Sequence, residues 1–501
     1  MQISFLTGDA VRSTVPVVII CHFEDDNRPL GYAAHADEIT EKLVTDILSA
    51  GDFTGKKNET LLAYSRTEDG ARRILLLGLG KRSEFTLDRY RGAFSTAVRY
   101  LRDRRITTIA FQAETTVHDF TVSDAVSAAV DGMLLGLYRF TPFKTTVDET
   151  AVMKECRIFV DNDADLKAIR HAAEESRQIA DAVIFTRDLV SSPANEMTPA
   201  IMAAKALELA SSSVRVTVLE TDEIEKLGMN ALIGVAKGSS EPPRFIILEY
   251  TGAPETSSPV VLVGKGVTFD SGGICIKPSD KMDQMKDDMA GGAAVMGTIK
   301  AAASLSLPIN IVGIIPAAEN LPGGSAYKPS DVLRSHSGKT IEVINTDAEG
   351  RLLLADALSY GHSRYRPQAM IDIATLTGAC LVALGEDLIG MLGTHDIIKE
   401  RLTVSAKATG EFLWELPLWD EYNELIKSDI ADVKNAGPRF AGTITAALFL
   451  KKFTGETPWV HLDIAGPSWA SKDKPYIPKG ASGCGVRLLV HCLKNWNALD
   501  E

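Results

Sequence analysis

Short apolar runs alternate with segments of helical periodicity along most of the chain, and this alternation constrains the fold more than any other feature. An apolar run of about four to eight residues between turn-forming residues predicts a buried strand, whereas apolar residues recurring every three or four positions predict a helix. Strands that alternate with helices pair mainly in parallel, because the helix supplies the crossover between them. The sequence therefore predicts an α/β fold with mixed, largely parallel sheets flanked by helices.

The length of the chain, 501 residues, exceeds what one ordinary hydrophobic core can organise and suggests about two to four domains. A long helical pattern runs from Asp163 to about Val190, where a segment containing serine and proline ends it. We expect this helix to join two α/β domains. The expected division is an N-terminal domain over residues 1–162, a linker helix over 163–192 and a C-terminal domain over 193–501.

Each expected domain has its own set of strands and helices. In the N-terminal domain the expected strands are Val17–Ile20, Ile74–Leu77 and Thr108–Phe111, and the expected helices are Arg89–Arg104 and Ser123–Tyr138. In the C-terminal domain the expected strands are Val214–Leu219, Phe245–Tyr250, Val260–Val263, Ile309–Ile315, Thr340–Ile344, Met370–Ile373 and Val460–Ile464. Its expected helices include Gly291–Ala303, Arg351–His362 and Ala441–Phe453.

Charge and composition exclude several classes of partner. The net charge of −13 argues against a nucleic acid or an anionic membrane held by overall electrostatics. The apolar runs are far shorter than the ~20 residues that a membrane helix needs, and the first residues lack the basic and long apolar regions of a secretory signal. The six cysteines are scattered without a C-x-x-C pair, which suits a reducing compartment. We therefore expect a cytoplasmic protein.

The segment Asn345–Arg351 places two carboxylates and a guanidinium at alternate positions directly after the expected strand Thr340–Ile344. In an extended chain, the side chains of Asp347, Glu349 and Arg351 would emerge on one side. The carboxyl end of a strand is also where ligands bind in open α/β sheets. We therefore expect these side chains to converge on a binding site, although the same residues read alone would also fit a solvated turn.

A glycine-rich segment upstream brings further charged residues to the same kind of position. Lys265 and Asp270 follow an expected strand and would lie in a loop at its end. Lys277 comes next, in an alternating segment where Ile274 and Ile276 would face inward. Read alone, the two lysines would be surface residues, so their interpretation depends on the acids around them.

Four acids in these segments would need cations if they met. They are Asp270, Asp288, Asp347 and Glu349. Without cations the four carboxylates would repel one another, whereas two divalent ions ~3.5–4 Å apart would remove the repulsion. Oxygen donors fit Mg or Mn, and Zn would be tolerated. Asp287 is interpreted as a helix-start residue, and the small residues after it would let that helix approach the sheet closely.

The order of these segments resembles the leucyl aminopeptidases of the cytosol type, a family of dinuclear metallopeptidases. The family signature Asn-Thr-Asp-Ala-Glu-Gly-Arg-Leu stands at Asn345–Leu352, and the spacing of the upstream lysines and aspartates agrees as well. The resemblance is strong from about Asn195 to Ala465 and weak over the first 160 residues. It implies an N-terminal domain of macro-like fold and a C-terminal catalytic peptidase domain.

Position by position, the resemblance implies a complete ligand set for two divalent ions. Asp270 and Glu349 would bridge the two ions. Lys265 and Asp288 would complete the coordination of one ion, and Asp347 that of the other. Lys265 would bind as a neutral amine, because a nearby dication penalises its protonated form.

The resemblance also implies catalytic roles for Lys277 and Arg351. Lys277 would stay charged and polarise the scissile carbonyl, while Arg351 would hold a bicarbonate ion that accepts a proton from the attacking water. The substrate would be a peptide with a free α-amine, and its leucine-like first residue would be released. The pocket for that residue would be formed by Met285, Thr375, Leu376, Gly378 and Ala465. A homohexamer with its metal sites facing an interior cavity is also implied.

Two other functions stay open at the level of sequence. Two-metal phosphatases and nucleases also cluster carboxylates, so a phosphoesterase is one alternative. A DNA-binding regulatory protein of the same family is the other, although the acidic balance argues against it. The dispersed histidines lack the H-E-x-x-H spacing of a mononuclear zinc protease.

Overall fold

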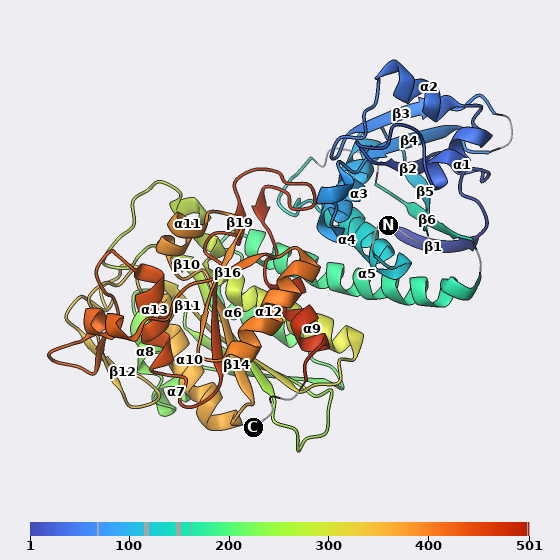
Figure 1. Ribbon diagram of the computed structural model, residues 1–501. Helices are drawn as coiled ribbons and strands as arrows, with labels where there is room; N and C mark the ends of the chain where they lie inside the picture. Colours follow the sequence, from blue (N-terminus) through green and yellow to red (C-terminus); the bar gives the residue numbers. More distant parts are fainter. Residues whose placement is uncertain (68–69, 115–119, 147–151, 162, 498, 500–501) are drawn as a thin grey trace. The chain divides into compact units, whose positions relative to one another are not determined.

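The computed structural model describes residues 1–67, 70–114, 120–146, 152–161, 163–497 and 499, which form two compact units (Figure 1). The first unit consists of residues 1–180 and 472–478, and the second of residues 181–471 and 479–501. The long helix α5 (Asp163–Ser191) contributes residues to both. None of the helices in these ranges combines the length and apolar character that a membrane crossing needs.

The first unit is built on a sheet in which neighbouring strands run parallel except β3 and β4. The strands across it are β1 (Gln2–Thr7), β6 (Glu155–Val160), β5 (Thr108–Gln112), β2 (Val18–His22), β4 (Arg73–Gly78) and β3 (Thr60–Tyr64). The helices are α1 (Tyr32–Ile39), α2 (Leu43–Ala50), η1 (Arg82–Glu84), α3 (Leu87–Arg102) and α4 (Val122–Gly136).

The apolar runs of this unit are continuous because both faces of the sheet are covered. Side chains alternate between the two faces of a strand, and β4 shows the result. Leu75 and Leu77 pack in a core with residues of α3 and α4, whereas Ile74 and Leu76 pack in a second core with residues of α1 and α2. A strand buried on both faces has no polar side, which explains why the sequence shows runs rather than alternation.

The second unit has a larger mixed sheet. Its strands, in order, are β16 (Leu413–Glu415), β15 (Ile389–Gly393), β18 (Trp459–Asp463), β14 (Ala369–Ala374), β9 (Val260–Gly264), β11 (Ile311–Asn320), β8 (Arg244–Tyr250) and β7 (Val214–Leu219), with β10 (Gly266–Asp270) also paired to β11. The central pairs from β18 through β11 are parallel. Small separate sheets are formed by β12 (Val332–Arg334), β13 (Thr340–Glu342) and β17 (Val433–Lys434), and by β19 (Trp469–Ala470) and β20 (Gly480–Ala481).

Helices flank this sheet on both sides. They are α6 (Pro199–Leu207), α7 (Thr221–Lys226), α8 (Asn230–Ala236), η2 (Met282–Met289), α9 (Ala290–Leu305), α10 (Gly350–Tyr365), α11 (Gly378–Leu384), α12 (Asp396–Thr409), η3 (Asp420–Ile426), α13 (Gly442–Lys451) and α14 (Val486–Lys494). A Cβ atom on Gly313 would lie 2.7 Å from Val295 of α9, and one on Gly361 of α10 would lie 3.3 Å from Ile314. Adjacent residues of a strand face opposite sides, so α9 and α10 cover opposite faces.

The small residues at the start of α9 allow close packing on the central strands. A Cβ atom on Gly264 would lie 2.5 Å from the carbonyl oxygen of Gly291, so neither backbone could carry a larger residue there without moving. The expected close approach of this helix is therefore confirmed. It brings the η2–α9 junction against the end of β9, where the charged residues gather.

The predicted α/β class with largely parallel sheets is confirmed, but two details differ. The predicted strand Thr340–Ile344 shortens to β13 and belongs to a small separate sheet rather than to the edge of the main one. Strand β10 was expected to be a loop. Its Gly-Val-Thr-Phe-Asp sequence has too few apolar residues to signal a strand, and it forms because it pairs in parallel with β11.

Candidate active site

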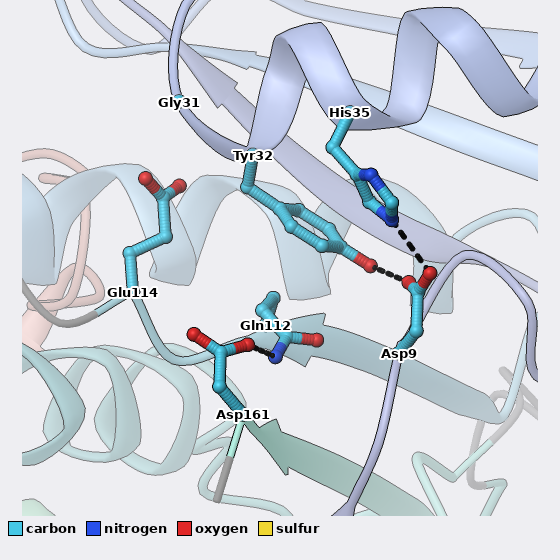
Figure 2. A pocket seen from close by; sticks show the side chains of 7 residues that line it. All are labelled: Asp9, Gly31, Tyr32, His35, Gln112, Glu114 and Asp161. Carbon is cyan, nitrogen blue, oxygen red and sulfur yellow. Dashed lines mark hydrogen bonds and ion pairs between the residues drawn. The ribbon is translucent and has the colours of Figure 1, made fainter.

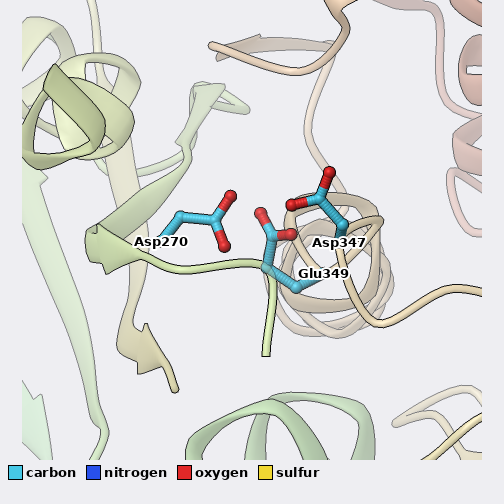
Figure 3. Close-up of side chains that lie close together, drawn as sticks. All are labelled: Asp270, Asp347 and Glu349. Atoms are coloured by element: carbon cyan, nitrogen blue, oxygen red, sulfur yellow. The ribbon is translucent and has the colours of Figure 1, made fainter. Parts of the chain in front are cut away.

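Carboxylates from two separate segments of the chain, the end of β10 and the turn that leads into α10, meet in the second unit. Asp270 ends β10, Asp347 lies in a turn after β13, and Glu349 is the residue that precedes α10. One oxygen from each of these three side chains lies within 4.8 Å of the others, and Figure 3 shows the carboxylates pointing toward one another. The expected convergence of Asp347 and Glu349 is therefore found. It arises from a turn, so the extended chain assumed from the sequence is wrong.

Two lysines lie among these acids. Lys265 Nζ is 2.7 Å from Asp288 Oδ1 and 2.8 Å from Glu349 Oε1, and it donates a hydrogen bond to the carbonyl oxygen of Thr375. Its side chain is 3% exposed, so these contacts replace water. The lysine reaches this place because it stands between β9 and β10, at the carboxyl end of a central parallel strand.

The second lysine bridges the other side of the cluster. Lys277 Nζ is 2.7 Å from Asp270 Oδ2 and 2.5 Å from Asp347 Oδ1, with 21% of its side chain exposed. A buried charge is tolerated only when it is paired, and here each ammonium group has two carboxylate partners. Lys265 therefore lies deep in the cluster, whereas Lys277 lies where a molecule arriving from solvent could contact it.

Asn320, at the end of β11, fixes the positions of the acids and was not predicted from the sequence. Its Nδ2 donates to Asp270 Oδ1 at 2.8 Å and to the carbonyl oxygen of Thr346 at 3.0 Å, and lies 3.4 Å from Glu349 Oε2. The backbone N–H of Gly272 donates a further hydrogen bond to Asp270 Oδ1. Asn320 is completely buried, so this amide holds two segments of the cluster in one geometry.

The charge balance of the cluster shifts the pKa values of its members. Burial raises the pKa of Asp288 and of Glu349, and the carboxylate of Asp270 raises both further. Burial opposes protonation of Lys265 and Lys277, but the surrounding carboxylates outweigh it and raise the pKa of both lysines. Four acids and two lysines leave an excess of negative charge in a buried volume.

The residues present fit a divalent metal site. Oδ2 of Asp288 is buried and has no hydrogen-bond partner among the described residues, so it offers a lone pair inside the cluster. The oxygens of Asp270, Asp347 and Glu349 lie close enough to share an ion. Hard oxygen donors of this kind suit Mg, Mn or Zn.

Arg351 lies in the first turn of α10, next to the acids. It is 8% exposed, and its Nε is a buried donor with no hydrogen-bond partner in the described part of the chain. Burial lowers the pKa of Arg351 to about 10, while Glu349 and Asp463 act in the opposite direction. The guanidinium is therefore still charged at neutral pH and has a donor available for an anion.

The residues expected to bind the substrate's first side chain come from several segments. Thr375 Oγ1 donates to Asp288 Oδ1 at 2.7 Å, which links this pocket position to the acids. Met285 lies in η2, shortly before Asp288, and is half-buried. Gly378 begins α11 and is exposed, with open space where a Cβ atom would stand.

Asp463, at the end of β18, ties the remaining two expected pocket residues together. Its Oδ1 accepts hydrogen bonds from the backbone N–H groups of Leu376 and Ala465, each at 3.1 Å, and from Thr377 at 3.4 Å. Its Oδ2 accepts from the Thr377 hydroxyl at 2.6 Å. Asp463 is fully buried and was missed from the sequence. A lone acid ending an apolar strand was the available signal.

One orientation expected from the sequence is wrong. Ile274 and Ile276 were expected to face inward, but they are 46% and 63% exposed. Gly272 and Gly273 adopt positive φ angles of 88° and 65°, so the chain turns here instead of continuing as a strand. The turn leaves the two isoleucines on the surface while it returns Lys277 toward Asp270.

The whole chain has relatives of known type. A family model described as the cytosol aminopeptidase family, catalytic domain, matches residues 184–490, and the N-terminal domain of the same family matches residues 15–146. A probable cytosol aminopeptidase of Geobacter sulfurreducens is 46% identical over 99% of both chains, and one of Geotalea uraniireducens is 47% identical over 99% of both.

Solved structures agree with this match. A structure of a tomato leucine aminopeptidase mutant has a TM-score of 0.88 and 32% identity, covering 98% of this chain and 96% of the other. The bottromycin maturation enzyme BotP in complex with Mn has a TM-score of 0.84 and 31% identity, covering 96% of this chain and 99% of the other. Neither likeness favours a phosphoesterase or a DNA-binding regulator.

Proposed function

Because this chain belongs to the cytosol aminopeptidase family, and is therefore a divalent-metal-dependent aminopeptidase, we propose that its buried acidic cluster is the catalytic centre and that it removes leucine-like residues from peptides. The observation that carries this proposal is the meeting of Asp270, Asp347 and Glu349 beside the partly exposed ammonium group of Lys277. A cluster of acids around a cation that solvent can reach suits hydrolysis of a neutral amide, whose carbonyl oxygen becomes negative as it reacts.

The metal-binding residues are assigned as two overlapping sets. We propose that Asp270 and Glu349 would be shared by two divalent ions. Lys265 and Asp288 would complete the ligand set of one ion, and Asp347 would complete that of the other. Mn or Zn would serve, and Mg also suits the oxygen donors. When bound, the two ions would activate a water molecule and polarise the scissile carbonyl.

The role of Lys265 as a ligand requires a neutral amine. Its ion pairs with Asp288 and Glu349 raise its pKa, so those pairs must give way when the carboxylates take up cations. The buried Oδ2 atom of Asp288 supports the assignment of this acid as a ligand, because it accepts no hydrogen bond from the described residues and its lone pairs are therefore available to an ion.

Two side chains would act on the charge and the proton of the reaction: one would stabilise the negative charge on the substrate's carbonyl oxygen, and the other would hold the group that accepts the proton of the water. Lys277, whose pKa is raised by its carboxylate partners, stays protonated and would stabilise the developing oxyanion. Arg351 would hold a bicarbonate ion through its free Nε, and that anion would take the proton released by the water.

The leucine-like preference rests on the pocket positions. Met285, Thr375, Leu376, Gly378 and Ala465 would form its lining. A mostly apolar lining with few polar groups selects an aliphatic side chain of matching size. We further propose that the enzyme is a cytoplasmic homohexamer. Light scattering during gel filtration would test the hexamer, for which a mass of six 54.0 kDa chains is expected.

The direct test of function uses matched substrates. We expect the Mn-loaded protein to hydrolyse leucine p-nitroanilide and to leave N-acetyl-leucine p-nitroanilide intact, because an acetyl group removes the free amine. Alanine, phenylalanine and lysine p-nitroanilides would rank the side-chain preference. Turnover of p-nitrophenyl phosphate without amide hydrolysis would overturn the proposed function.

A further inference from the structure

The first unit contains a pocket of about 420 Å³ that the catalytic centre does not use. Its lining residues are Asp9, Gly31, Tyr32, His35, Gln112, Glu114 and Asp161. They lie at or just after the carboxyl ends of the parallel strands β1, β5 and β6, or at the start of α1 (Figure 2). Ligands bind at this edge in open α/β sheets, and the volume lies within the range of small-molecule sites.

One wall of the pocket is held rigidly by Asp9. Its Oδ1 accepts a hydrogen bond from the Tyr32 hydroxyl at 2.6 Å and from the backbone N–H of Val11 at 3.0 Å. Its Oδ2 lies 2.6 Å from His35 Nε2. Because Asp9 is fully engaged, its role is to fix the Tyr32 ring and His35 rather than to meet a ligand.

Gln112 connects three segments of the pocket lining through hydrogen bonds. This side chain is 6% exposed, and its Oε1 accepts from the backbone N–H of Ala10 at 3.1 Å. Its Nε2 donates to Asp161 Oδ1 at 2.7 Å and to the carbonyl oxygen of Gly8 at 3.2 Å. The amide therefore orients the exposed Asp161 carboxylate at the pocket's edge. It binds Oδ1 of this carboxylate and does not bind Oδ2.

Glu114 supplies the second carboxylate. Gly31, which precedes α1, has a φ of 56°, a conformation that favours glycine, and it lies beside the Glu114 carboxylate, because a Cβ atom there would stand 2.9 Å from Glu114 Oε2. Burial raises the pKa of Glu114, and the nearby Asp161 carboxylate raises it further. A hydrogen bond from the backbone N–H of Tyr32 lowers the pKa of Glu114, and so, to a smaller extent, does Arg82, whose guanidinium is itself bound by Asp26 at 2.9 and 2.7 Å.

We propose that this pocket binds an organic cation with a primary ammonium or guanidinium group, placed between Glu114 and Asp161 and against the Tyr32 ring. Figure 2 shows the two carboxylates on the same side of the pocket, with the Tyr32 ring between Glu114 and His35. Carboxylates give charge-assisted hydrogen bonds to such a group, and an aromatic face attracts a cation.

A bare metal ion suits the pocket less well. Among the described residues, the set of three acidic or histidine groups close enough to share one ion is Asp270, Asp347 and Glu349. The acids of the pocket are therefore more widely spaced, which suits a cation with several donor atoms. A nucleotide or another anion would meet the three carboxylates of Asp9, Glu114 and Asp161, and the only basic side chain among the described lining residues, His35, is paired with Asp9.

The test is isothermal titration of the full-length protein, with its catalytic centre saturated with Mn²⁺. The probes are agmatine, cadaverine and tetramethylammonium, with AMP as the anionic comparison. We expect saturable binding of agmatine or cadaverine, weakened by added salt, and no binding of AMP. Agmatine binding more tightly than cadaverine would identify guanidinium as the preferred group. Tetramethylammonium, which cannot donate hydrogen bonds, should bind at least about tenfold more weakly.

The variants are Glu114→Gln and Asp161→Asn, each a neutral replacement of nearly the same shape. Each should weaken binding about tenfold, while Glu38→Gln, an exposed acid on the same helix α1 that does not line the pocket, should leave it unchanged. Leucine p-nitroanilide hydrolysis should be retained in all three variants, which checks that they fold. Absence of saturable binding by both amines, unchanged affinity in both pocket variants, or tighter binding of AMP would overturn the proposal.

Discussion

Removing the Asp463 carboxylate should disable the proposed substrate pocket while leaving the proposed metal ligands in place. This side chain is completely buried and accepts four hydrogen bonds, three from the backbone N–H groups of Leu376, Thr377 and Ala465 and one from the Thr377 hydroxyl. A hydrogen bond to a charged group contributes about 1.5–3 kcal/mol, and the contributions of bonds to one group do not add fully. We therefore expect Asp463→Ala to lower the free energy of unfolding by about 3–5 kcal/mol.

The isosteric Asp463→Asn separates charge from shape. The amide can still accept from the backbone N–H groups, so we expect a stability loss of only about 1–2 kcal/mol. Loss of the charge loosens the two pocket segments and should reduce kcat/KM for leucine p-nitroanilide about tenfold, mainly by raising KM. Mn²⁺ affinity, measured by titration, should stay within about twofold of wild type, because Asp463 is not among the proposed ligands.

Asp372→Asn provides the matched control. Asp372 is an equally buried acid on the neighbouring strand β14, but it accepts from Trp459 and pairs with His461 instead of holding the pocket. It should reduce stability without raising KM. The reasoning is refuted if folded Asp463→Ala keeps a kcat/KM close to that of wild type, or if the two asparagine variants change KM equally.

Three further outcomes can be checked directly. Lys277→Ala should lower kcat of the Mn-loaded enzyme about 10²–10³-fold with little change in thermal midpoint, because a preset cation beside an oxyanion is removed. Asp356→Ala should cost about 2–4 kcal/mol in urea unfolding, since three backbone N–H groups lose a buried acceptor. The carboxylate of Asp372 outweighs burial and raises the pKa of His461 above its ordinary 6.5. The difference in free energy of unfolding between wild type and His461→Gln should therefore be largest below pH 6.5, and it should shrink as the pH rises through the raised pKa of His461.

Several strands and helices, such as β4, β9 and α10, could be predicted because their own apolar residues define the faces that become buried. The same logic failed for β10, which has little apolar content and exists because β11 offers it a parallel partner. It also failed for Ile274 and Ile276, because the positive φ angles of two preceding glycines turn the chain. Local pattern therefore predicts elements well where burial is regular, and poorly where a neighbouring strand or a turn decides.

The candidate site was predictable in its acids and lysines but not in the residues that position them. Asn320 acts on Asp270 and Glu349 through the register of β10 on β11, and no spacing along the chain reveals that register. Asp463 likewise reaches Leu376 only because β18 lies beside β14. The pocket of the first unit has the same origin, since its lining comes from segments more than a hundred residues apart.

The central claim is that the acidic cluster holds two catalytic divalent ions, and metal stoichiometry tests it most directly. Titration of metal-free protein with Mn²⁺, followed by leucine p-nitroanilide assays at each point, should give two ions per chain and activity that appears as the sites fill. Glu349→Gln, which removes a proposed shared ligand, should bind fewer ions tightly and lose most activity while keeping its fold. Full activity in metal-free protein, or two tightly bound ions and normal turnover in Glu349→Gln, would contradict the account.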